Sequence, residues 1–175
     1  FRSIVASLRA DSHLDVSGLD IKVAVDLPPG GGLGCSAATG IATIRCLAPH
    51  LPPAAVLKYA SQWEGVFHGT PSGLDTATSA YGDCVEYRIG DPICSFVPPR
   101  PMWLAVTYTG SPSGTRSMIA KAAGRLAAKP AATVWLFDRL GALARVGRRA
   151  LEHSDPLSLG RVLTEAHGIL SELSL

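Results

Sequence analysis

The chain has 175 residues, of which 47% are hydrophobic and 17% are charged, and its formal net charge is +2. This length favours one domain of ordinary size or two small ones, and it excludes a large multi-domain enzyme. The hydrophobic fraction is ample for a core, which excludes intrinsic disorder as the main state. A net charge this small gives no reason to expect nucleic acid or a membrane surface as a partner.

The four cysteines do not form a C-x-x-C pair, which argues against a zinc knuckle and against a thioredoxin-type site. Free thiols in a chain of this composition indicate a reducing, cytoplasmic compartment, and two disulfides are the alternative. The most apolar long stretch, residues 131–146, is interrupted by three charged residues, so no membrane span is predicted there.

The first predicted elements surround a glycine-rich loop. Alternation of Ile21, Val23 and Val25 with less hydrophobic residues predicts a strand over residues 20–26. Residues 30–34, four of them glycines, must form a loop, and small residues with apolar ones at helical spacing predict a buried helix after it. The helices predicted in this half of the chain cover residues 35–47, 54–67 and 74–80.

The second half begins with a predicted strand pair, residues 84–89 and 93–97, around a Gly-Asp-Pro turn. The proline-rich segment 98–101 is the best candidate for a domain boundary. A strand over 103–109 is expected next, and Trp63, Trp103 and Trp135 are expected in the core. The remaining predicted elements are helices over 115–128, 131–153 and 156–173, the last starting at Asp155-Pro156, where Asp is a good cap and Pro suits the first turn.

The glycine-rich loop, Gly30 to Ala38, lies between a predicted strand and a predicted helix. Glycines let the backbone approach a ligand closely, and the first N–H groups of a helix attract anions, so a phosphate is the natural guest. A Walker A loop needs Gly-Lys-Ser/Thr, but Cys35-Ser36 follows Gly34 here. A dinucleotide fingerprint fails as well, because Cys35 occupies the place of its third glycine. A glycine turn without a ligand is the alternative.

Two carboxylates flank the second loop of interest. Glu64 lies near the end of a predicted helix, and Asp75 follows a Gly/Pro/Ser loop that can fold it back toward Glu64. Near a phosphate loop, one carboxylate could hold a hard cation while the other accepts a proton from an attacking hydroxyl. A solvated carboxylate at Glu64 and a simple helix cap at Asp75 are the alternatives.

Both loops resemble motifs of one family. Residues 29–38 read Pro-Gly-Gly-Gly-Leu-Gly-Cys-Ser-Ala-Ala. They resemble the GHMP kinase motif Pro-x-x-x-Gly-Leu-Gly-Ser-Ser-Ala, with Cys35 in place of the first serine. Residues 68–75, His-Gly-Thr-Pro-Ser-Gly-Leu-Asp, are similar to the His-Gly-x-Pro-Ser-Gly-x-Asp signature of its mevalonate kinases. The resemblance implies an α+β GHMP kinase fold. In this fold, residues 1–98 would form a ribosomal-protein-like N-terminal α/β domain, and residues 99–175 would form part of a ferredoxin-like C-terminal domain.

The resemblance also implies an activity, which is phosphoryl transfer from ATP to the C5 hydroxyl of mevalonate, giving the isoprenoid precursor 5-phosphomevalonate. It assigns Asp75 as the catalytic base, Ser36 and Glu64 as Mg²⁺ ligands, and His68, Ser72 and Thr115 to the substrate pocket. The partner is then a small alcohol, with neither nucleic acid nor a membrane, and a homodimer is possible by analogy. The residues assigned to ATP are Gly30, Gly31, Gly32, Leu33, Gly34, Cys35, Ser36 and Ala37.

Two alternatives stay open. The chain could be another GHMP-family metabolite kinase, such as a phosphomevalonate or sugar kinase, although the residue 68–75 signature argues against this. It could also be a non-catalytic member that binds a nucleotide or metabolite. The family opens with a Gly-Lys strand motif and closes with a second glycine-rich motif. Neither is found here, so we expect the chain to cover only the middle of a family member.

Overall fold

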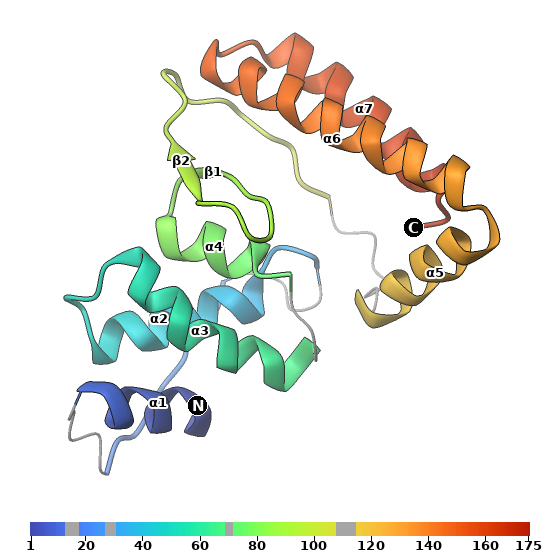
Figure 1. The fold of residues 1–175 in the computed structure, drawn as a ribbon. Helices are drawn as coiled ribbons and strands as arrows, with labels where there is room; N and C mark the ends of the chain where they lie inside the picture. Colours follow the sequence, from blue (N-terminus) through green and yellow to red (C-terminus); the bar gives the residue numbers. More distant parts are fainter. Residues whose placement is uncertain (13–17, 27–30, 69–71, 108–114) are drawn as a thin grey trace. The chain divides into compact units, whose positions relative to one another are not determined.

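Helices dominate the structure, a computed structural model that describes residues 1–12, 18–26, 31–68, 72–107 and 115–175. The chain divides into two units, Phe1–Phe96 and Val97–Leu175 (Figure 1). The division lies close to the proline-rich segment 98–101. The assignment of residues 1–98 and 99–175 to the two GHMP kinase domains stays a prediction.

The first unit is built on four helices, α1 (Arg2–Ser12), α2 (Cys35–Leu47), α3 (Pro53–His68) and α4 (Leu74–Tyr81). Apolar residues three and four positions apart give each helix one buried stripe, as a core-facing helix requires. The four helices lie next to one another (Figure 1), and their stripes meet in one cluster. Its buried members are Ile4, Leu8, Ile41, Ile44, Ala48, Val56, Tyr59, Ala60, Trp63 and Ala80.

Helices α2 and α3 approach each other closely where the indole of Trp63 lies over Gly40. A Cβ on Gly40 would stand 2.5 Å from Cδ1 of Trp63, so only glycine fits there. The indole Nε1–H donates a hydrogen bond to the carbonyl oxygen of Ser36 at 2.9 Å. These two contacts fix the first turns of α2 against the last turns of α3.

A short hairpin follows α4. Strands β1 (Cys84–Glu86) and β2 (Cys94–Phe96) pair antiparallel, with Cys84 opposite Phe96 and Glu86 opposite Cys94. Two three-residue strands are too few to be stable alone. The hairpin therefore depends on its contact with α4.

The second unit contains α5 (Thr115–Ala128), α6 (Pro130–Glu152) and α7 (Pro156–Glu172). Helices α6 and α7 run side by side (Figure 1) and bury Leu136, Ile169 and Leu173 between them. Asp155 caps α7, because its Oδ1 accepts a hydrogen bond from the Ser158 N–H at 3.0 Å, and Pro156 begins the helix. Among the described residues, no helix combines the length and the apolar character that a membrane span requires.

Most predicted helices are confirmed within one or two residues, and the start of α7 at Asp155-Pro156 is confirmed. Helix α1 was not predicted, although Ile4 and Leu8, four residues apart, are fully buried. The four cysteines are free thiols, so the alternative of two disulfides is wrong.

Two strand predictions are wrong. Residues 20–26 and 103–107 form no strand, and residues 108–109 lie outside the described residues. A strand is held by hydrogen bonds to a neighbour, and within the described part of the chain neither segment has a strand beside it. The prediction that all three tryptophans are core residues is also wrong for Trp103, which is 100% exposed, and for Trp135, which is 55% exposed.

A pair of glycine substitutions tests the packing of α2 on α3. Gly40→Ala places its Cβ inside the Trp63 ring contact, and we expect a loss of about 1–3 kcal/mol from overpacking. Gly65→Ala is the matched control on α3. Its Cβ meets nothing within 4 Å, so about 0.5–1 kcal/mol of added stability is expected. Urea unfolding measures both, and equal effects of the two variants would contradict the packing.

The cap of α7 predicts a pH-dependent effect. Hydrogen bonds from Ser158 lower the pKa of Asp155 in the folded chain, so the carboxylate adds stability above its unfolded pKa, about 3.9, and this is lost as the pH falls through the lower folded value. Asp155→Ala should lower the unfolding temperature at pH 7 and cost progressively less as the pH falls below about 4. Asp138→Ala, an exposed position inside α6, is the control and should show no such trend.

Candidate functional site

The glycine loop leads directly into α2. Gly32 and Gly34 adopt left-handed backbone conformations, with φ of 72° and 66°, and Gly34 is the N-cap residue of α2. A glycine has no side chain to satisfy the N–H groups of the first helical turn, which therefore stay available to a ligand. Gly30 lies outside the described residues. The geometry is that of an anion site at a helix N-terminus.

The loop that leads to Asp75, which we call the acid loop (residues 68–75), ends in a similar way, and the first turn of the helix that follows lies against the glycine loop. Gly73, with φ of 81°, is the N-cap residue of α4, and Asp75 lies in the first turn with an exposed side chain. A Cβ on Gly34 would lie 3.7 Å from the Cβ of Asp75, which is ordinary van der Waals contact. The beginnings of α2 and α4 therefore meet, and the Asp75 carboxylate lies beside the glycine loop.

Two side chains with buried oxygen atoms, Ser36 and Glu64, belong to the first turn of α2 and the end of α3. The Oγ atom of Ser36 is buried and has no hydrogen-bond partner among the described residues. Glu64 is 4% exposed, and one of its oxygens, Oε2, accepts a hydrogen bond from Thr76 Oγ1 at 2.6 Å. Since Trp63 binds the Ser36 carbonyl, the following residue Glu64 lies on α3 at the level of the first turn of α2.

The chemistry of the Ser36 and Glu64 side chains suits a hard cation. A buried carboxylate and an unpaired buried hydroxyl are both costly without a further partner. Both are oxygen ligands of the kind that Mg²⁺ takes. The described residues contain no cluster of three or more His, Cys, Asp or Glu side chains. A cation here would thus depend on few protein ligands and on phosphate oxygens, which is the usual arrangement for Mg²⁺ in phosphoryl-transfer sites.

The remaining predicted site residues surround the start of α4 or fall outside the description. Ser72 Oγ accepts a hydrogen bond from the Leu74 N–H at 3.3 Å, so this side chain shapes the turn. The Ser72 carbonyl accepts a hydrogen bond from Tyr87 Oη. The side chains of His68 and Thr115 lie outside the described residues.

Sequence reasoning did not single out Thr76 or Tyr87. Thr76 follows Asp75 directly and looks like an ordinary helix residue, since its partner Glu64 is twelve positions away. Tyr87 lies just beyond β1, fifteen positions from Ser72. For Thr76 the available signal is a short hydroxyl-bearing side chain in the first turn of α4; no local pattern marks Tyr87.

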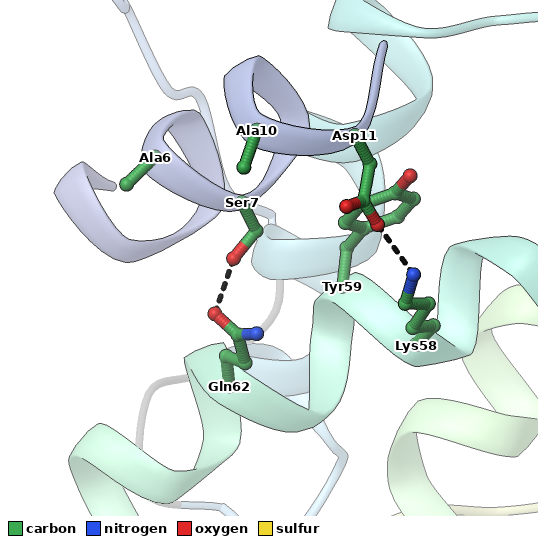
Figure 2. A pocket seen from close by; sticks show the side chains of 7 residues that line it. All are labelled: Ala6, Ser7, Ala10, Asp11, Lys58, Tyr59 and Gln62. Carbon is green, nitrogen blue, oxygen red and sulfur yellow. Dashed lines mark hydrogen bonds and ion pairs between the residues drawn. The ribbon is translucent and has the colours of Figure 1, made fainter.

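A separate pocket of about 350 Å³ lies between α1 and α3 (Figure 2). Its polar side chains pair with one another, Ser7 with Gln62 and Lys58 with Asp11. The bond from Lys58 lowers the pKa of the Asp11 carboxyl and raises that of Lys58. The pocket shares no residue with the glycine or acid loops. It is lined by Ala6, Ser7, Ala10 and Asp11 of α1 and by Lys58, Tyr59 and Gln62 of α3.

Comparison with known proteins agrees with the motifs. Residues 1–83 match the family model for the GHMP kinases N terminal domain. Mevalonate kinase of Pyrococcus horikoshii is 28% identical over 169 residues, covering 90% of this chain and 49% of that enzyme. Mevalonate kinase of Aeropyrum pernix is 30% identical over 158 residues, covering 87% of this chain and 49% of the relative. The chain resembles the mevalonate kinases of the GHMP kinase superfamily.

The fold agrees with that resemblance. The crystal structure of L. major mevalonate kinase in complex with R-mevalonate aligns with a TM-score of 0.67 at 24% identity, covering 84% of this chain and 47% of that one. This confirms the α+β fold of the GHMP kinases. The chain spans about half the length of the mevalonate kinases it matches.

Paired glycine substitutions test how Tyr87 holds the start of α4. Gly73 and Gly82 both have positive φ, so alanine brings similar backbone strain to each. Only at Gly73 would the new Cβ crowd Tyr87 Oη, at 2.7 Å, and force the ring to release Ser72. We expect Gly73→Ala to cost about 1 kcal/mol more than Gly82→Ala in urea unfolding.

Tyr87→Phe, combined with each glycine substitution, gives a double-mutant cycle, because it removes the hydroxyl that the new Cβ would crowd. In the Tyr87→Phe background the two alanine substitutions should become nearly equal in cost. An unchanged difference between them would show that Tyr87 does not hold this turn.

Proposed function

We propose that the chain forms the phosphate- and acid-loop part of an ATP-dependent mevalonate kinase. The observation that carries the proposal is the close approach of Gly34 and Asp75, since a Cβ on Gly34 would lie 3.7 Å from the Cβ of Asp75. It brings a glycine loop that could bind phosphate close to a potential proton acceptor. The family match of residues 1–83 and the resemblance to mevalonate kinases support the same reading.

On the nucleotide side, the backbone of residues 30–37 would surround the phosphates of ATP. The uncapped N–H groups of the first turn of α2 donate to phosphate oxygens, and the helix dipole favours their negative charge. Cys35 takes part through its backbone N–H, which its side chain does not alter. Ser36 and Glu64 would hold Mg²⁺, which when bound neutralises charge on the β and γ phosphate oxygens.

On the acceptor side, Asp75 would accept the proton of the C5 hydroxyl as that oxygen bonds to the γ-phosphorus and ADP leaves. Its exposed position in the first turn of α4 makes the carboxylate accessible to substrate. Ser72, His68 and Thr115 are proposed to shape the substrate pocket. Most of the acceleration would come from positioning and charge neutralisation.

Mevalonate is preferred as the substrate because the acid loop, residues 68–75, resembles the mevalonate kinase signature and the similar proteins carry that name. Another GHMP-family kinase would share the glycine loop without needing this signature.

A conservative change at the proposed base tests the function. Asp75→Asn keeps the size of the side chain and removes its ability to accept a proton. We expect mevalonate-dependent ADP formation by the full natural protein to fall about 10²- to 10⁴-fold in kcat. Calorimetric ATP binding should change by less than about threefold, because the proposed nucleotide contacts come from residues 30–37 and not from Asp75. The exposed Asp83, beyond the end of α4, gives the control variant Asp83→Asn, which should retain full activity.

The same assay separates the alternatives. Turnover of galactose, homoserine or phosphomevalonate without turnover of mevalonate would move the protein to another branch of the superfamily. ATP binding without turnover of any of these would favour a non-catalytic role. If Asp75→Asn retained a rate within a few-fold of the natural protein, Asp75 would not be the base.

A further inference from the structure

The Glu64 carboxylate is held by a side chain from another helix. The Thr76 hydroxyl of α4 donates a hydrogen bond to Oε2 of Glu64 on α3, with 2.6 Å between the two oxygens. Both residues are buried, with 3% and 4% of their surface exposed. A bond between a hydroxyl and a buried carboxylate is short and strong, because the acceptor is ionic and water does not compete.

Thr76 has a second acceptor within reach, the carbonyl oxygen of Gly73 at 3.3 Å. A hydroxyl has only one proton to donate. The distance to Glu64 Oε2 is shorter and that acceptor is charged, so the hydroxyl donates its hydrogen bond to Glu64. The side chain thus gives up the usual bond to its own helix and ties the start of α4 to α3.

We propose that Thr76 is a positioning residue that fixes the orientation of the Glu64 carboxylate for a divalent cation bound with the nucleotide. The proposal rests on the proposed function, in which Ser36 and Glu64 hold that cation. Because Oε2 is engaged by Thr76, the carboxylate cannot rotate freely in the buried site. Partners of this kind orient a metal ligand, and their loss commonly weakens the metal by about 10- to 100-fold.

The same helix provides a matched control. Thr78, two residues further along α4, is exposed, and its hydroxyl bonds to the Leu74 carbonyl at 3.0 Å within the helix. Replacing either threonine with valine removes a hydroxyl and keeps the branched shape. Only the replacement at Thr76 removes a bond to Glu64.

The test measures ADP binding to the full natural protein by calorimetry, once with saturating Mg²⁺ and once in EDTA. The ratio of the two affinities isolates the contribution of the cation. Thr76→Val should reduce this ratio about tenfold or more and leave binding in EDTA unchanged. Thr76→Ser, which restores the hydroxyl, and Thr78→Val should both keep the natural ratio. If Thr76→Val unfolds at the assay temperature, Thr76→Ala takes its place.

Two results for the variant would overturn the inference. An unchanged ratio in Thr76→Val, with both affinities at their natural values, would show that the hydroxyl does not position Glu64 for the cation. An unchanged ratio that comes from an equal loss of affinity with Mg²⁺ and in EDTA would show a purely structural role. If the natural protein turns over mevalonate while either result holds, the proposed function stands and only the role of Thr76 fails. If the natural protein binds no nucleotide with Mg²⁺ or in EDTA, both the proposed function and the role of Thr76 are contradicted.

Discussion

The packing of Trp63 on Gly40 is the contact on which the candidate site depends. It brings α2 and α3 closer than any side chain at position 40 would allow. The indole N–H then binds the Ser36 carbonyl, which places the first turn of α2 beside the end of α3. Glu64 follows Trp63 in the chain and is therefore also placed near the first turn of α2. A hydrophobic contact thus sets the position of two polar groups.

Two polar side chains beside this contact are costly to bury. Glu64 is a buried carboxylate that accepts a hydrogen bond from the Thr76 hydroxyl, and Ser36 Oγ is buried with no partner among the described residues. A core arranged for stability alone would avoid such groups, because each costs free energy when buried without a full set of bonds. Their cost is explained if the site is completed by a cation and a phosphate.

Local signals in the sequence predicted much of this arrangement. Glycines before a helix, a carboxylate at a helix end and a Gly/Pro/Ser loop before Asp75 indicated the loops and the candidate residues. The sequence could not indicate the contact of Gly34 with Asp75 or the bond of Thr76 to Glu64, because both join segments many residues apart. The strand predicted at residues 20–26 failed for a related reason. Alternation shows which faces a strand would have, and pairing depends on a neighbour elsewhere in the chain.

Replacement of one buried hydroxyl tests the central claim most directly, which is that α2 begins at a site for a phosphate and its cation. Ser36→Ala removes an unpaired polar atom, so the unfolding temperature of the ligand-free protein should stay the same or rise. Calorimetric binding of ADP in the presence of Mg²⁺ should weaken at the same time, by about tenfold or more if Ser36 is a metal ligand. A less stable protein with unchanged Mg²⁺-dependent binding would contradict the account.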